Sequence, residues 1–179
     1  MATSKLAPKQ RSSPHGTQSW LAVVRAYNLC DAVMTARLAA LGVRVAEHEV
    51  LANLATAPGI TQQALAARCF VAKSGVSMLL TQMESRGWVR READAADARV
   101  KRLQLTPAGQ ALAAQTLQVQ AQVVAALVAG ASETALEPVT SLMQRERPAL
   151  RMLYELLVAH SPALQPGEFL PVGSAFAAI

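Results

Sequence analysis

The apolar residues of this chain recur at steps of three and four over most of its length, which is the spacing of amphipathic helices. One such stripe runs along residues 20–41, and Gly42 is a good helix stop. A shorter helix is predicted over 47–56, and Pro58 with Gly59 then predicts a turn. We therefore expect the chain to begin with a long helix, a short helix and a turn.

Residues 61–87 have the pattern of two short helices joined by a very short turn. Thr61 is a suitable N-cap for the first, which is expected to end near Cys69. In the second helix, four apolar residues form one stripe at steps of three and four: Val76, Leu79, Leu80 and Met83. The opposite face is polar, and Gly87 is well placed to end the helix.

A basic hairpin is predicted next, with strands over 88–91 and 100–105 and a turn over 94–98. Ile60 is expected to add one short strand beside it. Helix, turn, helix and a basic two-stranded wing form a shape that docks on DNA.

The remainder of the chain predicts two long helices. Thr106 followed by Pro107 is an N-cap with proline at the first helical position, and the helix is expected to reach Gly130. Ser132 is a candidate cap for the last helix, in which Pro148 predicts a kink. The first and last helices have more apolar surface than so small a domain needs, so we expect them to pack against a second copy of the chain.

The net charge of +5 is unevenly distributed. Eight basic and four acidic residues lie between 61 and 102, whereas residues 18–60 are balanced and those after 102 are net acidic. A basic patch confined to the wing and its flanks is typical of phosphate binding. A basic face that serves only solubility is the alternative interpretation.

Residues 47–109 resemble the winged-helix core of the MarR family of bacterial transcription regulators. The resemblance lies in PGITQQALAARCFVAKSGVSMLLTQMESRGWV, in Asp97 and Arg99 of the wing, and in LTPAG at 105–109. It implies a mainly α winged helix-turn-helix protein with a two- to three-stranded wing and N- and C-terminal dimerisation helices. It also implies that a homodimer binds pseudo-palindromic operator DNA and that a small ligand loosens this binding.

Five regions are expected on this basis. They are a disordered arm at 1–17, a dimerisation helix at 18–45, the winged helix-turn-helix core at 46–106, long dimerisation helices at 107–160 and an irregular tail at 161–179.

The candidate DNA-binding residues lie on the second short helix, at the start of the first and in the wing. They are Thr61, Gln62, Lys73, Ser74, Ser77, Thr81, Gln82, Arg90, Arg99 and Lys101, with Arg91 and Arg102 as further contacts to the DNA backbone. By resemblance, Ser74 and Ser77 match the polar pair of the recognition helix, and Arg99 matches the minor-groove arginine, held by Asp97. The chain departs from the family at Met78, where an arginine is frequent.

His48 is a polar residue on an otherwise apolar helix face and must find a partner. In proteins of this type effectors bind between the dimerisation helices and the DNA-reading domain. This predicts a site for a small aromatic carboxylate formed by His48 with Trp20, Arg25 and Tyr27. The alternative is that His48 is a core residue satisfied by the protein itself.

Other classes of function are less well supported by the residues. The three histidines form no HExxH motif, and we find neither a glycine-rich phosphate loop nor a signature of nucleophilic catalysis, so we expect no enzyme, no metal site and no cofactor. No apolar run has the length of a membrane span and no signal-peptide core is present, which predicts a cytoplasmic protein with no membrane partner.

Two alternatives share the fold. Cys30 and Cys69 are both expected to be small buried apolar residues, but a redox sensor that switches through Cys30 remains open. A dimeric protein-interaction module without specific DNA binding is the other alternative.

Overall fold

The computed structural model describes residues 14–69, 73–94, 97 and 99–160. The interpretations of 1–13 as a disordered arm and of 161–179 as an irregular tail lie outside these residues. In chain order the elements are α1 (Pro14–Ala39), α2 (Val45–Thr56), α3 (Gln62–Arg68), α4 (Lys73–Ser85), β1 (Val89–Ala93), β2 (Lys101–Leu105), α5 (Pro107–Val128) and α6 (Glu133–His160). The structure confirms the prediction of a mainly helical protein with a small wing.

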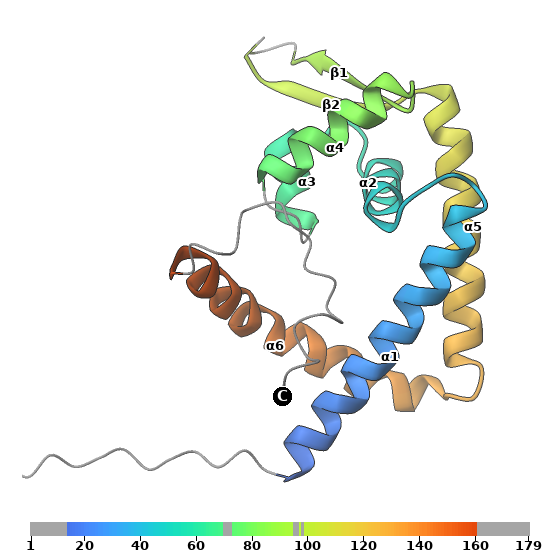
Figure 1. Ribbon diagram of the computed structural model, residues 1–179, viewed down its shortest axis with the longest axis vertical. Helices are drawn as coiled ribbons and strands as arrows, with labels where there is room; N and C mark the ends of the chain where they lie inside the picture. Colours follow the sequence, from blue (N-terminus) through green and yellow to red (C-terminus); the bar gives the residue numbers. More distant parts are fainter. Residues whose placement is uncertain (1–13, 70–72, 95–96, 98, 161–179) are drawn as a thin grey trace, which may run out of the picture.

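The first helix is longer than its apolar stripe predicted. It begins at Pro14 rather than near residue 20, so the last residues of the predicted arm are helical. Proline is favoured in the first helical turn because it needs no partner for a backbone N–H there. The C-terminal part of α1 packs against α5, whereas its N-terminal part diverges from α5 towards the bottom of the view (Figure 1).

The wing is an antiparallel pair whose register runs from Val89 opposite Leu105 to Ala93 opposite Lys101. A third segment joins it at an isolated bridge between Thr61 and Arg102. The predicted short strand at Ile60 is therefore reduced to this bridge, with the Ile60 carbonyl accepting a bond from the N–H of Leu103 at 3.0 Å. The turn before α3 is thereby attached to the second strand of the wing.

One hydrophobic core joins α1, α2, the α3–α4 pair, the wing and α5 as far as Val123. Its fully buried side chains are Leu38, Val50, Leu51, Leu54, Leu65, Val76, Leu80, Met83, Val89 and Leu103. The apolar stripe predicted for α4 is part of this core. The burial of one face of α4 fixes which of its residues point outward.

The start of α5 packs closely against the chain that precedes the wing. Thr106 Oγ1 accepts a bond from the N–H of Gly109 at 3.0 Å, which confirms the predicted N-cap. A Cβ atom at Gly109 would lie 1.9 Å from the carbonyl oxygen of Trp88. Glycine is required here because the backbone of another segment occupies the space of a side chain.

By length and composition alone, α5 is apolar enough to cross a membrane, which corrects the expectation that no segment could do so. Its polar side chains, however, contact the rest of the protein. Gln122 accepts a bond from Arg37 of α1 at 2.7 Å, and Gln120 pairs with His48 of α2 at 3.1 Å. These bonds connect α5 to the helices of the same domain.

Several apolar side chains lie on the surface of the three long helices. They are Trp20, Leu21, Val23, Tyr27, Leu29 and Val33 of α1, Val124 and Leu127 of α5, and Val139, Leu142, Met143 and Met152 of α6. The core formed by the described residues includes no residue of α6. This helix begins at the predicted cap, where Ser132 Oγ accepts a bond from the N–H of Ala135, and it runs through Pro138 and Pro148.

Candidate nucleic-acid interface

The helix pair α3–α4 forms as the sequence predicts. Thr61 Oγ1 accepts a bond from the N–H of Ala64 at 3.1 Å and so caps α3, which ends at Arg68 with Cys69 as its C-cap. Gln62, the first residue of α3, is half-buried. After α4, Gly87 adopts a φ of 69°, a left-handed conformation that glycine reaches without steric cost and that ends the helix.

The outward face of α4 lies opposite its buried stripe and includes Ser77, Met78, Thr81, Gln82 and Ser85, all exposed. These residues share the surface that the sequence assigned to DNA binding. Lys73 and Ser74 belong to the first turn of the helix, and their side chains lie outside the described residues. Three of the candidates, Ser77, Thr81 and Gln82, therefore gather on one exposed face, with the apolar Met78 at its centre.

Arg91 holds one edge of this face. From β1 its Nη1 donates to Glu84 Oε2 at 2.7 Å, and its Nη2 donates to Thr81 Oγ1 at 3.3 Å. Thr81 in turn donates its hydroxyl proton to the carbonyl of Ser77 at 3.0 Å. Arg91 thus connects the wing to α4, and its contact to the DNA backbone stays a prediction.

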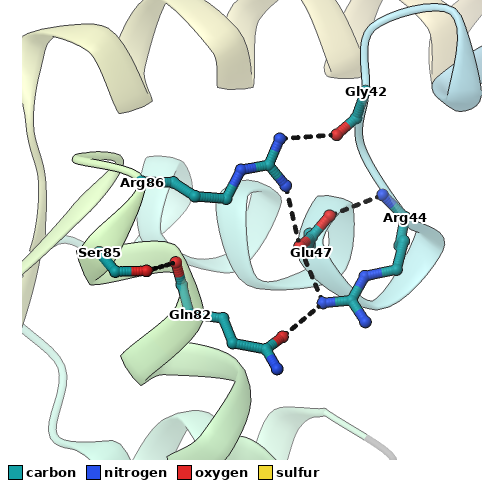
Figure 2. Close-up of polar contacts among 6 residues, drawn as sticks. All are labelled: Gly42, Arg44, Glu47, Gln82, Ser85 and Arg86. Carbon is teal, nitrogen blue, oxygen red and sulfur yellow. Dashed lines mark hydrogen bonds and ion pairs between the residues drawn. The ribbon is translucent and has the colours of Figure 1, made fainter.

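Arg44 holds the opposite edge from the N-terminus of α2 (Figure 2). Its Nη2 donates to Gln82 Oε1 at 2.7 Å and to Glu47 Oε1 at 2.9 Å. Glu47 also accepts a bond at 3.3 Å from Arg86, whose other terminal nitrogen donates to the carbonyl of Gly42 at 2.9 Å. Gln82, predicted to contact DNA, therefore has its carbonyl oxygen engaged by a neighbouring helix.

Glu47 is the buried centre of this network, with a side chain only 1% exposed. Burial acts to raise the pKa of this carboxyl group, but hydrogen bonds from the side chain and backbone of Arg44 and the charges of Arg44 and Arg86 outweigh it, so that the pKa is lowered. Arg86 also stacks on the indole of Trp88, with its guanidinium carbon 3.6 Å from the ring centroid. A charged Glu47 thus connects α2 with the end of α4.

Sequence reasoning did not identify Arg44, Glu47 and Arg86 as parts of the site. A local signal for two of them was available, because Glu47 is the third residue of α2 and accepts a bond from the N–H of Arg44, the N-cap residue, at 2.8 Å. An N-cap followed three residues later by glutamate is half of a capping box. The contacts of Arg86 and Gln82 join distant segments and have no such local signature.

In the wing, Arg99 projects into solvent with 91% of its side chain exposed. Both oxygens of Asp97 accept bonds from its guanidinium at 3.0 Å, in the arrangement that the sequence predicted. These hydrogen bonds lower the pKa of Asp97 and raise that of Arg99. The tip of the wing therefore presents a cation held in one orientation.

The other basic residues of the wing differ in how far they are engaged by the protein. Arg90 is exposed and pairs with Glu92 at 2.9 Å. Arg102 pairs with Asp94 and donates to the carbonyl of Gly59 at 3.0 Å, so it ties the wing to the turn before α3 instead of projecting freely. Lys101 is exposed at the end of β2.

His48, the candidate effector residue, is buried between α2 and α5. Its Nε2 bonds to Gln120 Oε1, whereas its buried Nδ1 has no hydrogen-bond partner among the described residues. Burial lowers the pKa of this imidazole, against the smaller opposing effect of the bond to Gln120. Half of its hydrogen-bonding capacity is thus satisfied and half is not.

The structure does not bury the other three candidate effector residues beside His48. Trp20, Arg25 and Tyr27 are exposed along α1. The pKa of Tyr27 is raised by partial burial and by the nearby charges of Asp31 and Glu49. Tyr27 therefore lies close enough to α2 for the charge of Glu49 to act on its hydroxyl, while the side chain remains half exposed.

The two cysteines differ in their surroundings. Cys69 is buried, as predicted, and burial raises the pKa of its thiol to about 12. Cys30 is only half-buried, which corrects the expectation that both are fully enclosed. Among the described residues, no group of three or more His, Cys, Asp or Glu side chains is arranged to hold a metal ion.

Comparison with known proteins yields two family matches. The profile described as MarR family matches residues 41–100, which comprise the end of the α1–α2 connection, α2 to α4 and the first strand of the wing. A second profile, for the second domain of the BREX system ATPase PglY protein, matches residues 126–179, which comprise α6 and the tail beyond the described residues.

The chain is similar to the transcriptional regulator HosA of Escherichia coli, with 37% identity over 73 residues, 41% of this chain. The match spans only 54% of the length of HosA.

Two solved structures share the fold. A mutant MarR of E. coli complexed with operator DNA superposes with a TM-score of 0.63 and 22% identity over 75% of this chain and 98% of that one. BpsR of Bordetella bronchiseptica, described with regulation of its DNA binding by 6-hydroxynicotinic acid, has a TM-score of 0.64 and 18% identity over 73% of this chain and 98% of that one.

Proposed function

We propose that this chain, whose residues 41–100 match the MarR family, is a winged helix-turn-helix transcription regulator that binds pseudo-palindromic operator DNA as a homodimer. The observation that carries the proposal is the face of α4. It is exposed from Ser77 to Ser85, is braced by Arg91 on one edge and Arg44 on the other, and adjoins a wing that presents Arg99. A rigid exposed helix beside a cationic wing suits the major groove and the adjacent minor groove.

The dimer follows from the exposed apolar side chains of α1, α5 and α6. Trp20, Leu29 and Leu127 are 46%, 70% and 61% exposed, and burial of such side chains against a second copy would be favourable. Two copies related by a two-fold axis would place two α4 helices on successive turns of one DNA face. This arrangement explains why the operator should be pseudo-palindromic.

The buried, unpartnered Nδ1 of His48 favours regulation by a ligand, here proposed to be a small aromatic acid. His48 is bonded to Gln120 of α5. Its neighbour in the chain, Glu47, accepts a bond from Arg86 at the end of α4. A ligand that accepts or donates a bond at Nδ1 would act where the DNA-reading and dimerisation helices meet. Release of DNA requires only that the ligand prefer a dimer in which the two α4 helices are not one DNA turn apart. BpsR and its 6-hydroxynicotinic acid lend support by analogy of fold.

The test of DNA binding is fluorescence anisotropy of the purified full chain on DNA from its own upstream region and on a scrambled duplex, across a salt series. We expect tight binding to the first duplex only, with an affinity that falls steeply as salt rises. Equal and weak binding to both duplexes would contradict the proposal and favour a protein-interaction module. Light scattering at micromolar concentration should give the mass of a dimer.

The effector is tested in the same assay with benzoate, salicylate and 6-hydroxynicotinic acid, on the wild type and on His48→Phe. We expect one of them to release DNA from the wild type and to raise its melting temperature, and both responses to be lost in the variant. Equal responses in the two proteins would remove His48 from the site.

Peroxide sensitivity of DNA binding that disappears in Cys30→Ser would instead favour the redox sensor. A cytoplasmic location is part of the proposal, because the operator DNA is there.

A further inference from the structure

Met78 occupies the centre of the outward face of α4 with 61% of its surface exposed. It lies one turn before Thr81 and two turns before Ser85 on the line opposite the buried stripe. A single exposed apolar side chain is ordinary on a protein surface. At this position, however, it lies where the proposed DNA contact is made.

The polar groups around Met78 are largely engaged by the protein. The hydroxyl of Thr81 donates to the carbonyl of Ser77 and accepts a bond from Arg91. The hydroxyl of Ser85 donates to the carbonyl of Gln82, whose side-chain oxygen accepts from Arg44. The described part of this face therefore offers fewer free groups for base edges than its sequence suggests, and its most prominent side chain is apolar.

The major groove contains one apolar group, the C5-methyl of thymine, and side chains that recognise it are apolar. Methionine suits this contact because it is long, unbranched and polarisable. Arg44 and Arg91 brace α4 on the two edges of this face through Gln82 and Glu84, so the helix that carries Met78 is held in one position. We propose that Met78 is a specificity-determining residue that contacts the methyl group of a thymine in each operator half-site. This inference rests on the proposed DNA-binding function.

The expected size of the effect follows from the burial of one methyl group. Removal of one buried methyl costs about 0.8 kcal/mol, which is about fourfold in affinity. Substitution in both half-sites of a dimer's operator should therefore cost about sixteenfold, if the two contacts are independent. A change of this size is measurable by anisotropy.

The experiment starts from duplexes that the full-length wild type selects from randomised DNA. Each thymine of a selected duplex is replaced in turn by deoxyuridine, which removes only the methyl group, and affinity is measured for the wild type and for Met78→Ala. We expect one position in each half-site at which the wild type loses about fourfold and Met78→Ala loses nothing. Ser85→Ala, on the same line of α4, serves as the control and should keep the loss seen in the wild type.

The outcomes separate the inference from the function on which it rests. If a specific duplex is selected but no thymine is sensitive, or if Met78→Ala retains the sensitivity, the inference is wrong while DNA binding stands. If no duplex is enriched by selection, both fail. Misfolding of the variant would lower its affinity for thymine and uracil duplexes alike, so the ratio between them remains a valid measure.

Discussion

Arg91 Nη1 lies 2.7 Å from Glu84 Oε2, and this ion pair connects the first strand of the wing to the helix that precedes it. The same guanidinium reaches the hydroxyl of Thr81 and, at 3.4 Å, the carbonyl of Ser77. One side chain thus spans two turns of α4. The angle between the wing and α4 determines whether both can enter neighbouring grooves, so this contact is expected to matter for DNA binding more than for stability.

Replacement of Arg91 by alanine is expected to weaken binding to all DNA sequences while lowering the free energy of unfolding by about 1 kcal/mol or less, because the pair is partly exposed. The measurement is anisotropy together with urea unfolding. A double-mutant cycle with Glu84→Gln should give a coupling of about 0.5–1 kcal/mol. Strictly additive effects would show that the pair contributes nothing. Arg90→Ala, which breaks the exposed pair of the preceding residue with Glu92, is the control for stability.

Arg99→Ala is expected to weaken operator binding by about 1–3 kcal/mol, since Arg99 projects from the tip of the wing and is held in one orientation by Asp97. Stability should not change, because the side chain makes contact only with Asp97 among the described residues. Arg145→Ala is a matched control, as Arg145 is also exposed and pairs with its neighbour Glu146 at 3.2 Å, on α6. Equal losses in a gel-shift titration would mean that overall charge, and not the wing contact, sets the affinity.

Gly109→Ala is expected to destabilise the protein by about 2 kcal/mol or more, because its Cβ would overlap the carbonyl oxygen of Trp88, a backbone atom that cannot move aside without displacing the wing. Gly130→Ala is the control. A Cβ there meets nothing within 4 Å, so the free energy of unfolding should stay within about 0.5 kcal/mol of the wild type. Thermal unfolding followed by circular dichroism measures both, and similar melting temperatures for the two variants would contradict the close approach.

The sequence predicted those features that depend on neighbouring residues. The caps at Thr61 and Thr106, the stop at Gly87 and the buried stripe of α4 all follow from local spacing. The paired hydrogen bonds between Asp97 and Arg99 also join residues that are close in the sequence.

What could not be predicted depends on how distant segments pack. Arg44 meets Gln82 and Arg102 meets Gly59 only once the tertiary fold is formed, and nothing near either arginine in the sequence reveals its partner. Basic residues that the sequence assigned to DNA therefore divide into those that project and those that hold the domain together. Apolar periodicity likewise identified α6 as a helix but cannot say what covers its exposed side chains.

His48 should make the stability of the protein depend on pH below about 6.5. Its pKa is lowered in the folded state, so the stabilisation from the neutral imidazole is complete above the unfolded pKa of about 6.5 and is lost as the pH falls through that value towards the folded pKa. Urea unfolding at several pH values should show this loss in the wild type and not in His48→Phe. Parallel pH profiles for the two proteins would contradict the assignment of the shift to His48.

Glu47 should also make the stability of the protein depend on pH, but in a lower pH range than His48. Glu47→Gln removes the negative charge shared by Arg44 and Arg86 from a fully buried position. Both arginines are partly exposed and can be solvated again, so the expected loss is about 1–2 kcal/mol at pH 7 and not the larger cost of a fully buried pair. The pKa of Glu47 is lowered in the folded state, so its contribution is present above the unfolded pKa of about 4.3 and disappears as the pH falls through the folded pKa.

The difference in unfolding free energy between the wild type and Glu47→Gln should therefore be constant from pH 8 to 5 and narrow below about pH 4.3. Glu92→Gln, which breaks an exposed pair in the wing, should differ little from the wild type throughout. A gap that persists undiminished at pH 3 would mean that the shape and hydrogen bonds of the Glu47 side chain, and not its charge, hold α2 to the end of α4. Gln82 and Arg86 belong to that end of α4. Glu47→Gln should therefore also weaken DNA binding at every pH at which it lowers the free energy of unfolding.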